Sequence, residues 1–271
     1  MRWCLVSLSF LMTGCQTLPS LEGRTQSSFF SKEQVADTYF AQALTPLEQQ
    51  HGVDKSAIFP LIEADEAFAA RMMLAKHAQR SLDVQYYIWR NDMTGTMLFE
   101  ALHAAADRGV RVRLLLDDNN TNGSDPILMG LHAHDNIEVR LFNPFMLRKP
   151  RWPGFITDLS RLNRRMHNKS FTADNSLTII GGRNIGDEYF GATDDVLFAD
   201  LDVLSAGAAV QDVSQDFDKY WHSQSSYPID RVIPHTAGLP LDELRQQAEF
   251  IAASPAAQQY VESLRESPFI A

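Results

Sequence analysis

Cysteine is scarce in this chain and confined to one end. Cys4 and Cys15 are its only two cysteines among 271 residues, and both lie in the first fifteen positions. Residues 16–271 therefore form no disulfide of their own, no cysteine-based zinc site and no thiol nucleophile.

Positive charge is also in short supply. The formal net charge is -10 at pH 7, from 24 Lys and Arg against 34 Asp and Glu. Nucleic acid is normally bound by Lys and Arg side chains that displace counterions from phosphate, so the prediction is a protein with no nucleic-acid partner. Glycine-rich loops of the Walker or dinucleotide type are missing too, which leaves mononucleotide chemistry unsupported.

Long apolar runs are absent, although hydrophobic residues make up 45% of the chain, enough for a sizeable core. The first fifteen residues have one positive charge at Arg2, a short apolar stretch and then small residues. This is the layout of an export signal, and it is too short to span a bilayer as a helix.

The end of that segment, Met12-Thr13-Gly14-Cys15, resembles the bacterial lipobox, with Met12 in place of the usual Leu. The resemblance implies an exported protein whose Cys15 is lipidated and anchored to a membrane of the bacterial envelope. Gln16 in place of Asp fits the outer membrane. The alternative is an ordinary signal peptide or a misassigned start codon.

Composition divides the chain into four parts. Residues 1–15 are the signal and lipobox, and residues 16–31, rich in Ser, Thr, Gln and Pro, are predicted to be a tether. Residues 32–222 are the predicted catalytic domain. Residues 223–271 are polar and are expected to be a linker or C-terminal extension.

Short β-branched runs alternate with amphipathic helical stretches through the predicted domain. Strands are expected at 82–89, 110–116, 137–142, 167–172, 177–180 and 201–204, and helices at 65–78, 95–107, 126–134 and 208–222. This alternation predicts an α/β fold with a mixed, largely parallel sheet flanked by helices. The prolines, basic residues and aromatics of residues 143–166 interrupt the pattern and indicate an active-site loop.

One short segment carries the chemistry. His167 and Lys169 are two residues apart, so a strand would place both side chains on one face, and Asp174 follows five residues after Lys169. A neutral imidazole can attack phosphorus, while an ammonium neutralises the charge that builds on the nonbridging oxygens. The pattern therefore favours phosphodiester chemistry.

The residues downstream of Asp174 extend this motif. Gly181-Gly182-Arg183-Asn184 is similar to the turn that follows the His-Lys-Asp motif of the phospholipase D superfamily, with Gly182 in place of the usual Ser. Residues 181–190, with residues 82–89 and 111–120, resemble the bacterial cardiolipin synthases of that superfamily, most closely their C type. The resemblance covers about residues 65–222.

This resemblance implies a phospholipase D-like domain in which a histidine nucleophile forms a covalent phosphohistidine, and His167 would be that nucleophile or the acid. Lys169 and Asn184 would bind the phosphate, and Asp174 would be a structural or orienting carboxylate. Gly182 and Arg165 are predicted to lie at the substrate. The family needs no metal or other cofactor.

A basic and aromatic group of residues lies just before His167. It comprises Arg148, Lys149, Arg151, Arg161, Arg164 and Arg165, interleaved with Phe142, Phe145, Trp152 and Phe155. In an acidic chain, such a group is predicted to steer an anionic phospholipid headgroup while the aromatics lie at the membrane interface. The alternative is a solvated loop whose aromatics belong to the core.

The family builds one active site from two such motifs, and this chain has one. No other histidine is followed two positions later by lysine. The second motif is therefore expected from a homodimer partner or from a missing C-terminal half. The sequence predicts a phosphatidyltransferase of the cardiolipin synthase type. The alternatives are a phospholipase D hydrolase, a dimeric single-motif nuclease, and a catalytically incomplete half-enzyme that binds phospholipid or a partner chain.

Overall fold

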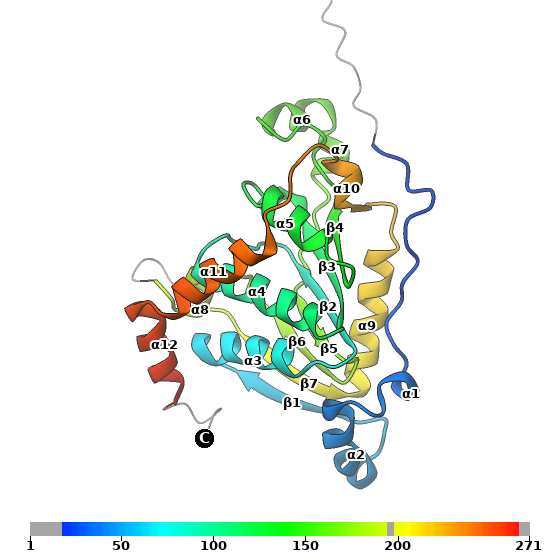
Figure 1. The fold of residues 1–271 in the computed structure, drawn as a ribbon. Coiled ribbons are helices and arrows are strands. Elements are labelled where there is room, and N and C mark those ends of the chain that lie inside the picture. Colours follow the sequence, from blue (N-terminus) through cyan, green and yellow to red (C-terminus); the bar gives the residue numbers. More distant parts are fainter. Residues whose placement is uncertain (1–17, 194–197, 266–271) are drawn as a thin grey trace, which may run out of the picture.

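The computed structural model describes residues 18–193 and 198–265, built around one eight-stranded sheet (Figure 1). Across the sheet the strand order is β1-β7-β6-β5-β2-β3-β4-β8. The strands are β1 (Ser56–Leu61), β2 (Ser81–Tyr86), β3 (Arg111–Asp117), β4 (Ile137–Phe142), β5 (Ser170–Ala173), β6 (Leu177–Gly181), β7 (Asp202–Gly207) and β8 (Ser226–Pro228).

Helices flank this sheet, as predicted. They are α1 (Lys32–Val35), α2 (Tyr39–His51), α3 (Ala64–His77), α4 (Met93–Asp107), α5 (Asp125–His132), α6 (Trp152–Thr157), α7 (Leu159–Leu162), α8 (Asp187–Phe190), α9 (Ala208–Trp221), α10 (Ile229–Val232), α11 (Leu241–Ala252) and α12 (Pro255–Arg265). Within the described ranges, none of them is both long and apolar enough to cross a bilayer.

The mixed sheet is confirmed, but its parallel part is smaller than expected. Among the strands of the described residues, β2 with β3 and β3 with β4 are parallel, and the other five pairings are antiparallel. Parallel neighbours need a long crossover, which α4 and α5 provide. Three residues, Asp174 to Ser176, join β5 to β6, and so short a turn allows only an antiparallel hairpin.

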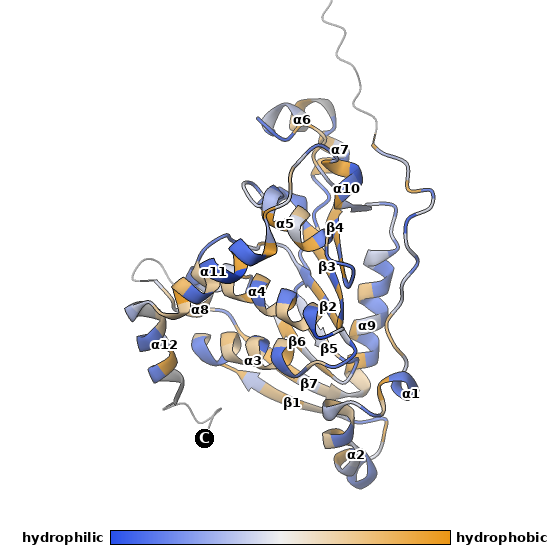
Figure 2. Ribbon diagram, in the orientation of Figure 1, coloured by the Kyte–Doolittle hydropathy of each residue, from blue (hydrophilic) through white to orange (hydrophobic). Residues whose placement is uncertain are grey.

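Alternation along β3 shows that both faces of the sheet are covered. Leu114 and Leu116 belong to the main core under α3, α4 and α5, whereas Leu115 packs with Phe217 and Trp221 of α9. Apolar colour accordingly gathers on the strands and inner helix faces, and polar colour on the outer faces (Figure 2).

The segment predicted to be a tether lies against the domain from Arg24 onward. Arg24 is 8% exposed and donates to the carbonyl oxygens of His222 and Ser226. Arg113 donates to the carbonyl oxygen of Ser27 at 2.7 Å. Buried cations need acceptors. The backbone of His222 and Ser226 supplies them to Arg24, and that of Ser27 supplies one to Arg113, so this part is not a free tether.

Residues 223–265 also belong to the fold. Their strand β8 pairs with β4, and α11 packs on α4 through the buried Leu244 and Ala248. Farther on, Tyr260 donates to the carbonyl oxygen of Phe190 at 2.8 Å. The amphipathic character of α11 explains why this segment, expected to be a linker or C-terminal extension, is docked on the helical layer (Figure 1).

Candidate active site

His167 and Lys169 come together immediately before β5. The lysine Nζ lies 3.1 Å from the imidazole Nδ1 and donates to the His167 carbonyl oxygen at 2.7 Å. The imidazole is exposed, whereas Lys169 is 7% exposed. The two side chains therefore converge, although the strand begins at Ser170 and not at His167.

The surroundings favour the neutral form of His167. Desolvation lowers the pKa of its imidazole, and the Lys169 ammonium lowers it further. Desolvation is likewise the largest cause that lowers the pKa of Lys169. The ring of Tyr87 lies 4.6 Å from the imidazole centroid and 5.6 Å from the lysine Nζ, so one aromatic ring contacts both groups. A neutral imidazole is the form that can attack phosphorus.

Asn184 lies at the same end of the sheet. Its Oδ1 accepts from the backbone N–H of Ile88 at 3.0 Å, one residue after Tyr87. The side chain is 4% exposed. The carboxamide is thus held in one orientation beside the residue that contacts His167.

A carboxylate that the motif does not include faces the pair. The negative charge of Asp200 raises the pKa of both His167 and Lys169, against the effect of burial. A Cβ added at Gly182 would lie 2.3 Å from Asp200 Oδ1, so the glycine leaves room for that carboxylate. The usual Ser at position 182 would displace it. Asp200 reaches this position through the pairing of β6 with β7, which aligns Gly181 with Asp202. No local sequence pattern predicts this placement.

Asp174 lies at the far end of β5 from His167. It occupies the turn to β6 with a positive φ of 50° and is fully buried. Its carboxylate accepts from the backbone N–H groups of Gln79, Arg80 and Ser81 at 3.0, 2.7 and 2.9 Å. Burial still raises its pKa. Its contacts join the β5–β6 turn to the start of β2. In this structure Asp174 therefore stabilises the fold.

Asp117, at the end of β3, fixes the backbone that leads into the site. Its Oδ2 accepts from Met166 N at 2.8 Å and its Oδ1 from Asn119 N at 2.9 Å. Burial raises the pKa of this carboxyl to about 6. Arg165, predicted to bind substrate, instead pairs with Asp117 at 3.2 Å and donates to the carbonyl oxygen of Asn143 at 2.7 Å.

The predicted headgroup-steering group needs a similar correction. Arg148 is paired with Asp118 and Asp125, and Arg151 donates to the carbonyl oxygen of Asp118. Arg161 is paired with Asp158 at 2.5 Å. Acidic side chains from neighbouring turns therefore bind most of these cations inside the protein. Two members of the group, Lys149 and Arg164, are exposed.

Comparison with known proteins identifies the family of the chain. A family model described as "Cardiolipin synthase, PLD-like domain" matches residues 72–221, which is more than half of the 271 residues. The chain belongs to that family. The matched part of the PLD-like domain runs from α3 to the end of α9 and contains His167, Lys169 and Asn184.

Relatives of this PLD-like domain are longer. The chain is 53% identical over 230 residues to cardiolipin synthase C of Escherichia coli, covering 85% of this chain and 48% of that protein. An uncharacterized protein of Helicobacter pylori is 40% identical over 182 residues, covering 66% of this chain and 36% of that one. The chain thus spans about half the length, or less, of these curated relatives.

A solved structure shares the fold of this PLD-like domain. The phosphatidylserine synthase of Haemophilus influenzae superposes with a TM-score of 0.50 at 14% identity, covering 72% of this chain and 42% of that one. The likeness concerns the fold alone.

Cys15, the predicted lipidation site, lies outside the described residues.

Proposed function

We propose that this PLD-like domain transfers phosphatidyl groups between phospholipids through a covalent intermediate on His167. The observation that carries the proposal is the convergence of His167 and Lys169, with 3.1 Å between Nδ1 and Nζ, in a member of the cardiolipin synthase family. Such a pair supplies both a nucleophile and a charge that stabilises the phosphorane-like transition state.

The resting contact implies a movement during the reaction. A lysine ammonium that donates to Nδ1 leaves the proton of a neutral imidazole on Nε2, where it blocks attack from that nitrogen. When a lipid phosphate enters, its nonbridging oxygens compete for the ammonium of Lys169. The proton of Nε2 can then exchange through water to Nδ1, and Nε2 becomes the nucleophile.

The first step forms one bond and breaks another. His167 Nε2 bonds to the phosphorus of a phosphatidylglycerol, and the glycerol oxygen leaves as it takes a proton from a general acid. In the second step, the hydroxyl of an acceptor lipid gives its proton to that same group and displaces His167 from phosphorus. Water in place of the acceptor would yield phosphatidic acid, so transfer requires that an alcohol reach the intermediate first.

The general acid is the group that this chain does not supply by motif, because His167 is its only histidine with lysine two positions later. We propose that a second His-x-Lys motif completes the site. It would come from a second copy of the chain or from a further polypeptide segment such as the relatives' greater length provides. The net charge of -10 weighs against the nuclease alternative, because nucleic acid is normally bound by an excess of Lys and Arg.

The proposed location follows the substrate. A lipobox-like segment ending in Cys15 supports export and lipid anchoring in the bacterial envelope, with the outer membrane favoured by Gln16. Phospholipid substrates, which carry two acyl chains, would then reach the site by diffusion within the same bilayer. Mass spectrometry of the membrane-extracted protein tests this, because an acylated N-terminal Cys15 is the expected product and an unmodified Cys15 would contradict it.

Lipid turnover tests the function. The full chain is incubated with mixed micelles of phosphatidylglycerol beside a His167→Ala variant, with products resolved by mass spectrometry and oligomeric state measured by light scattering. Cardiolipin that disappears with His167→Ala is the expected result. Phosphatidic acid alone would establish the hydrolase instead. Folded protein that leaves lipid intact but cleaves DNA would overturn the proposal in favour of the nuclease.

A further inference from the structure

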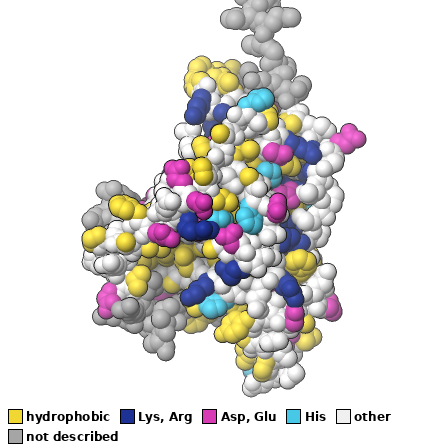
Figure 3. All heavy atoms as spheres, viewed as in Figure 1, with side chains coloured by type: hydrophobic (Ala, Val, Ile, Leu, Met, Phe, Trp, Pro, Cys, Tyr) yellow, Lys and Arg dark blue, Asp and Glu magenta, His cyan; other side chains and the backbone are white. Residues whose placement is uncertain are grey.

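Helices α6 and α7 present apolar side chains to solvent at one end of the molecule. Trp152, Phe155, Ile156 and Leu159 are 62%, 39%, 75% and 56% exposed. The two helices project beyond the sheet at the end where Figure 3 shows hydrophobic side chains gathered, with a basic side chain beside them. Four such side chains within eight residues of chain form an apolar tip, which we define as Trp152, Phe155, Ile156 and Leu159.

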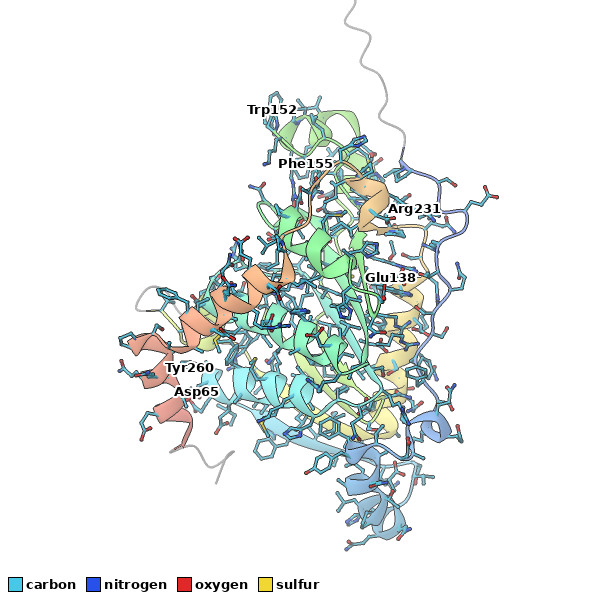
Figure 4. All side chains as sticks on the ribbon, viewed as in Figure 1. Asp65, Glu138, Trp152, Phe155, Arg231 and Tyr260 are labelled. Atoms are coloured by element: carbon cyan, nitrogen blue, oxygen red, sulfur yellow. The ribbon has the colours of Figure 1, made fainter. Side chains whose placement is uncertain are left out.

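The same helices are firmly packed on their inner side. Phe145 and Leu162 are each 1% exposed, and the ring of Phe155 lies 5.2 Å from that of Phe145 in an edge-to-face contact. A Cβ added at Gly154 would lie 3.0 Å from Leu162. Figure 4 shows Trp152 at the outer edge and Phe155 nearer to the body of the domain. The tip is therefore an ordered surface held by its own small core.

Charge around the tip differs from that of the whole chain. Residues 145–165 contain six Lys and Arg against one Asp, while the chain as a whole has a net charge of -10. Four of these six cations are bound internally by carboxylates or carbonyl oxygens. The remaining two, Lys149 and Arg164, are exposed at the two ends of the α6–α7 segment.

The base of this segment also carries the nucleophile. Asn143, where the loop begins, accepts from Arg165 at 2.7 Å, and Arg161 donates to the carbonyl oxygen of Pro144 at 2.9 Å. Met166 is then bonded to Asp117, and His167 is the next residue. Any surface that the tip contacts is therefore held at a fixed position relative to the site.

We propose that the apolar tip inserts into the interfacial layer of an anionic phospholipid bilayer, with Lys149 and Arg164 against the headgroups. The inference rests on the proposed function, because it describes how that site meets its lipid. Trp and aliphatic side chains bordered by cations are the composition that binds such an interface.

The geometry disfavours a second copy of the chain as the occupant. A symmetric contact through the tip would bring the exposed cations of both copies together. Four side chains are also far fewer than the roughly 20 residues per partner that a stable protein interface uses. A bilayer needs only a small apolar insertion with headgroup contacts.

Vesicle binding tests the proposal apart from turnover. The full chain carrying Trp3→Phe and Cys15→Ser, so that neither an acyl anchor nor a terminal tryptophan contributes, is mixed with vesicles of phosphatidylglycerol and phosphatidylcholine. Trp89 and Trp221 are 2% and 0% exposed, so Trp152 is the tryptophan whose emission responds to the bilayer. Its emission is expected to shift to the blue with phosphatidylglycerol vesicles, and the shift to weaken when phosphatidylcholine replaces them.

Substitutions make the test specific. Ile156→Ser should weaken cosedimentation with the vesicles about tenfold, the loss expected from one inserted aliphatic side chain. Phe250→Ser is the matched control, because Phe250 is 80% exposed on α11, and it should bind as the parent does. His167→Ala should also bind fully, so a failure of the chemistry would leave this result intact. Equal binding by Ile156→Ser and the parent would overturn the inference, as would a tip substitution that dissociates a dimer and leaves vesicle binding unchanged.

Discussion

Asp117 Oδ2 accepts a hydrogen bond from the backbone N–H of Met166 at 2.8 Å, and this bond fixes the backbone directly before His167. The carboxylate stands at the end of a buried parallel strand, while the amide belongs to a loop that leaves the sheet for more than twenty residues. The buried side chain of Asp117 therefore attaches the end of this loop to the sheet.

Removing this carboxylate should reduce both stability and activity. Asp117→Ala leaves the N–H groups of Met166 and Asn119 without their acceptor and the guanidinium of Arg165 without its carboxylate partner. We expect a loss of about 1–3 kcal/mol in the free energy of unfolding by urea. Turnover of the folded fraction should fall about a hundredfold, as expected when a nucleophile is displaced by about an ångström. Unchanged turnover would show that His167 does not depend on this bond.

The raised pKa of Asp117 predicts a pH dependence of stability. Its folded pKa is about 6 against the usual 3.8, so the protonated carboxyl is the form that the fold favours. This contribution is fully present below pH 4 and is lost as pH rises through 6. The free energy of unfolding of the native chain should therefore fall relative to that of Asp117→Asn between pH 4 and 7, by at most about 3 kcal/mol. Urea titrations at both pH values measure it, and parallel curves would contradict the shift.

Asp174 should affect stability far more than chemistry. Asp174→Ala leaves three backbone N–H groups of residues 79–81 without an acceptor in a buried turn, which should cost about 3 kcal/mol or more. Because the residue lies at the opposite end of β5 from His167, turnover per folded molecule should stay within a few-fold of the parent. Asp174→Asn, which keeps one acceptor, should lie between them in stability. A well-folded but inactive Asp174→Ala would assign this carboxylate to the chemistry.

Gly182 and Asp200 should behave as a coupled pair. In Gly182→Ser the new side chain meets Asp200 Oδ1, so the carboxylate must move away from His167 and Lys169. We expect turnover to fall about tenfold in Gly182→Ser, in Asp200→Ala and in the double variant alike, since the serine has nothing left to displace. Losses that simply multiply in the double variant would mean that the two residues act separately.

Much of the α/β fold was predictable because helices and strands differ in periodicity. The helix predicted at 208–222 is observed at Ala208–Trp221, and the strand predicted at 137–142 is observed at those residues. Strand direction was less accessible. Period-two patterning says which side chains are buried, not which strand lies alongside, so the antiparallel pairings of β5 to β7 emerged only from the structure.

The candidate site divides in the same way. His167 and Lys169 were predicted from their local spacing and Asn184 from the family resemblance, and the structure brings the three to one end of the sheet. Asp117 and Asp200 act through contacts between distant parts of the chain, which no local motif encodes. The loop arginines were predicted to bind or steer the substrate for a related reason. The carboxylates that Arg165 and its neighbours pair with are remote from them in sequence.

The most direct test of the account is to trap the intermediate. The full chain is incubated with phosphatidylglycerol, quenched under alkaline conditions that preserve phosphohistidine, digested and analysed by mass spectrometry. The account predicts a phosphatidyl group on the peptide containing His167, absent from His167→Ala and still formed by Asp174→Asn. Lipid turnover with a phosphatidyl group on another side chain, or with none on His167, would contradict it.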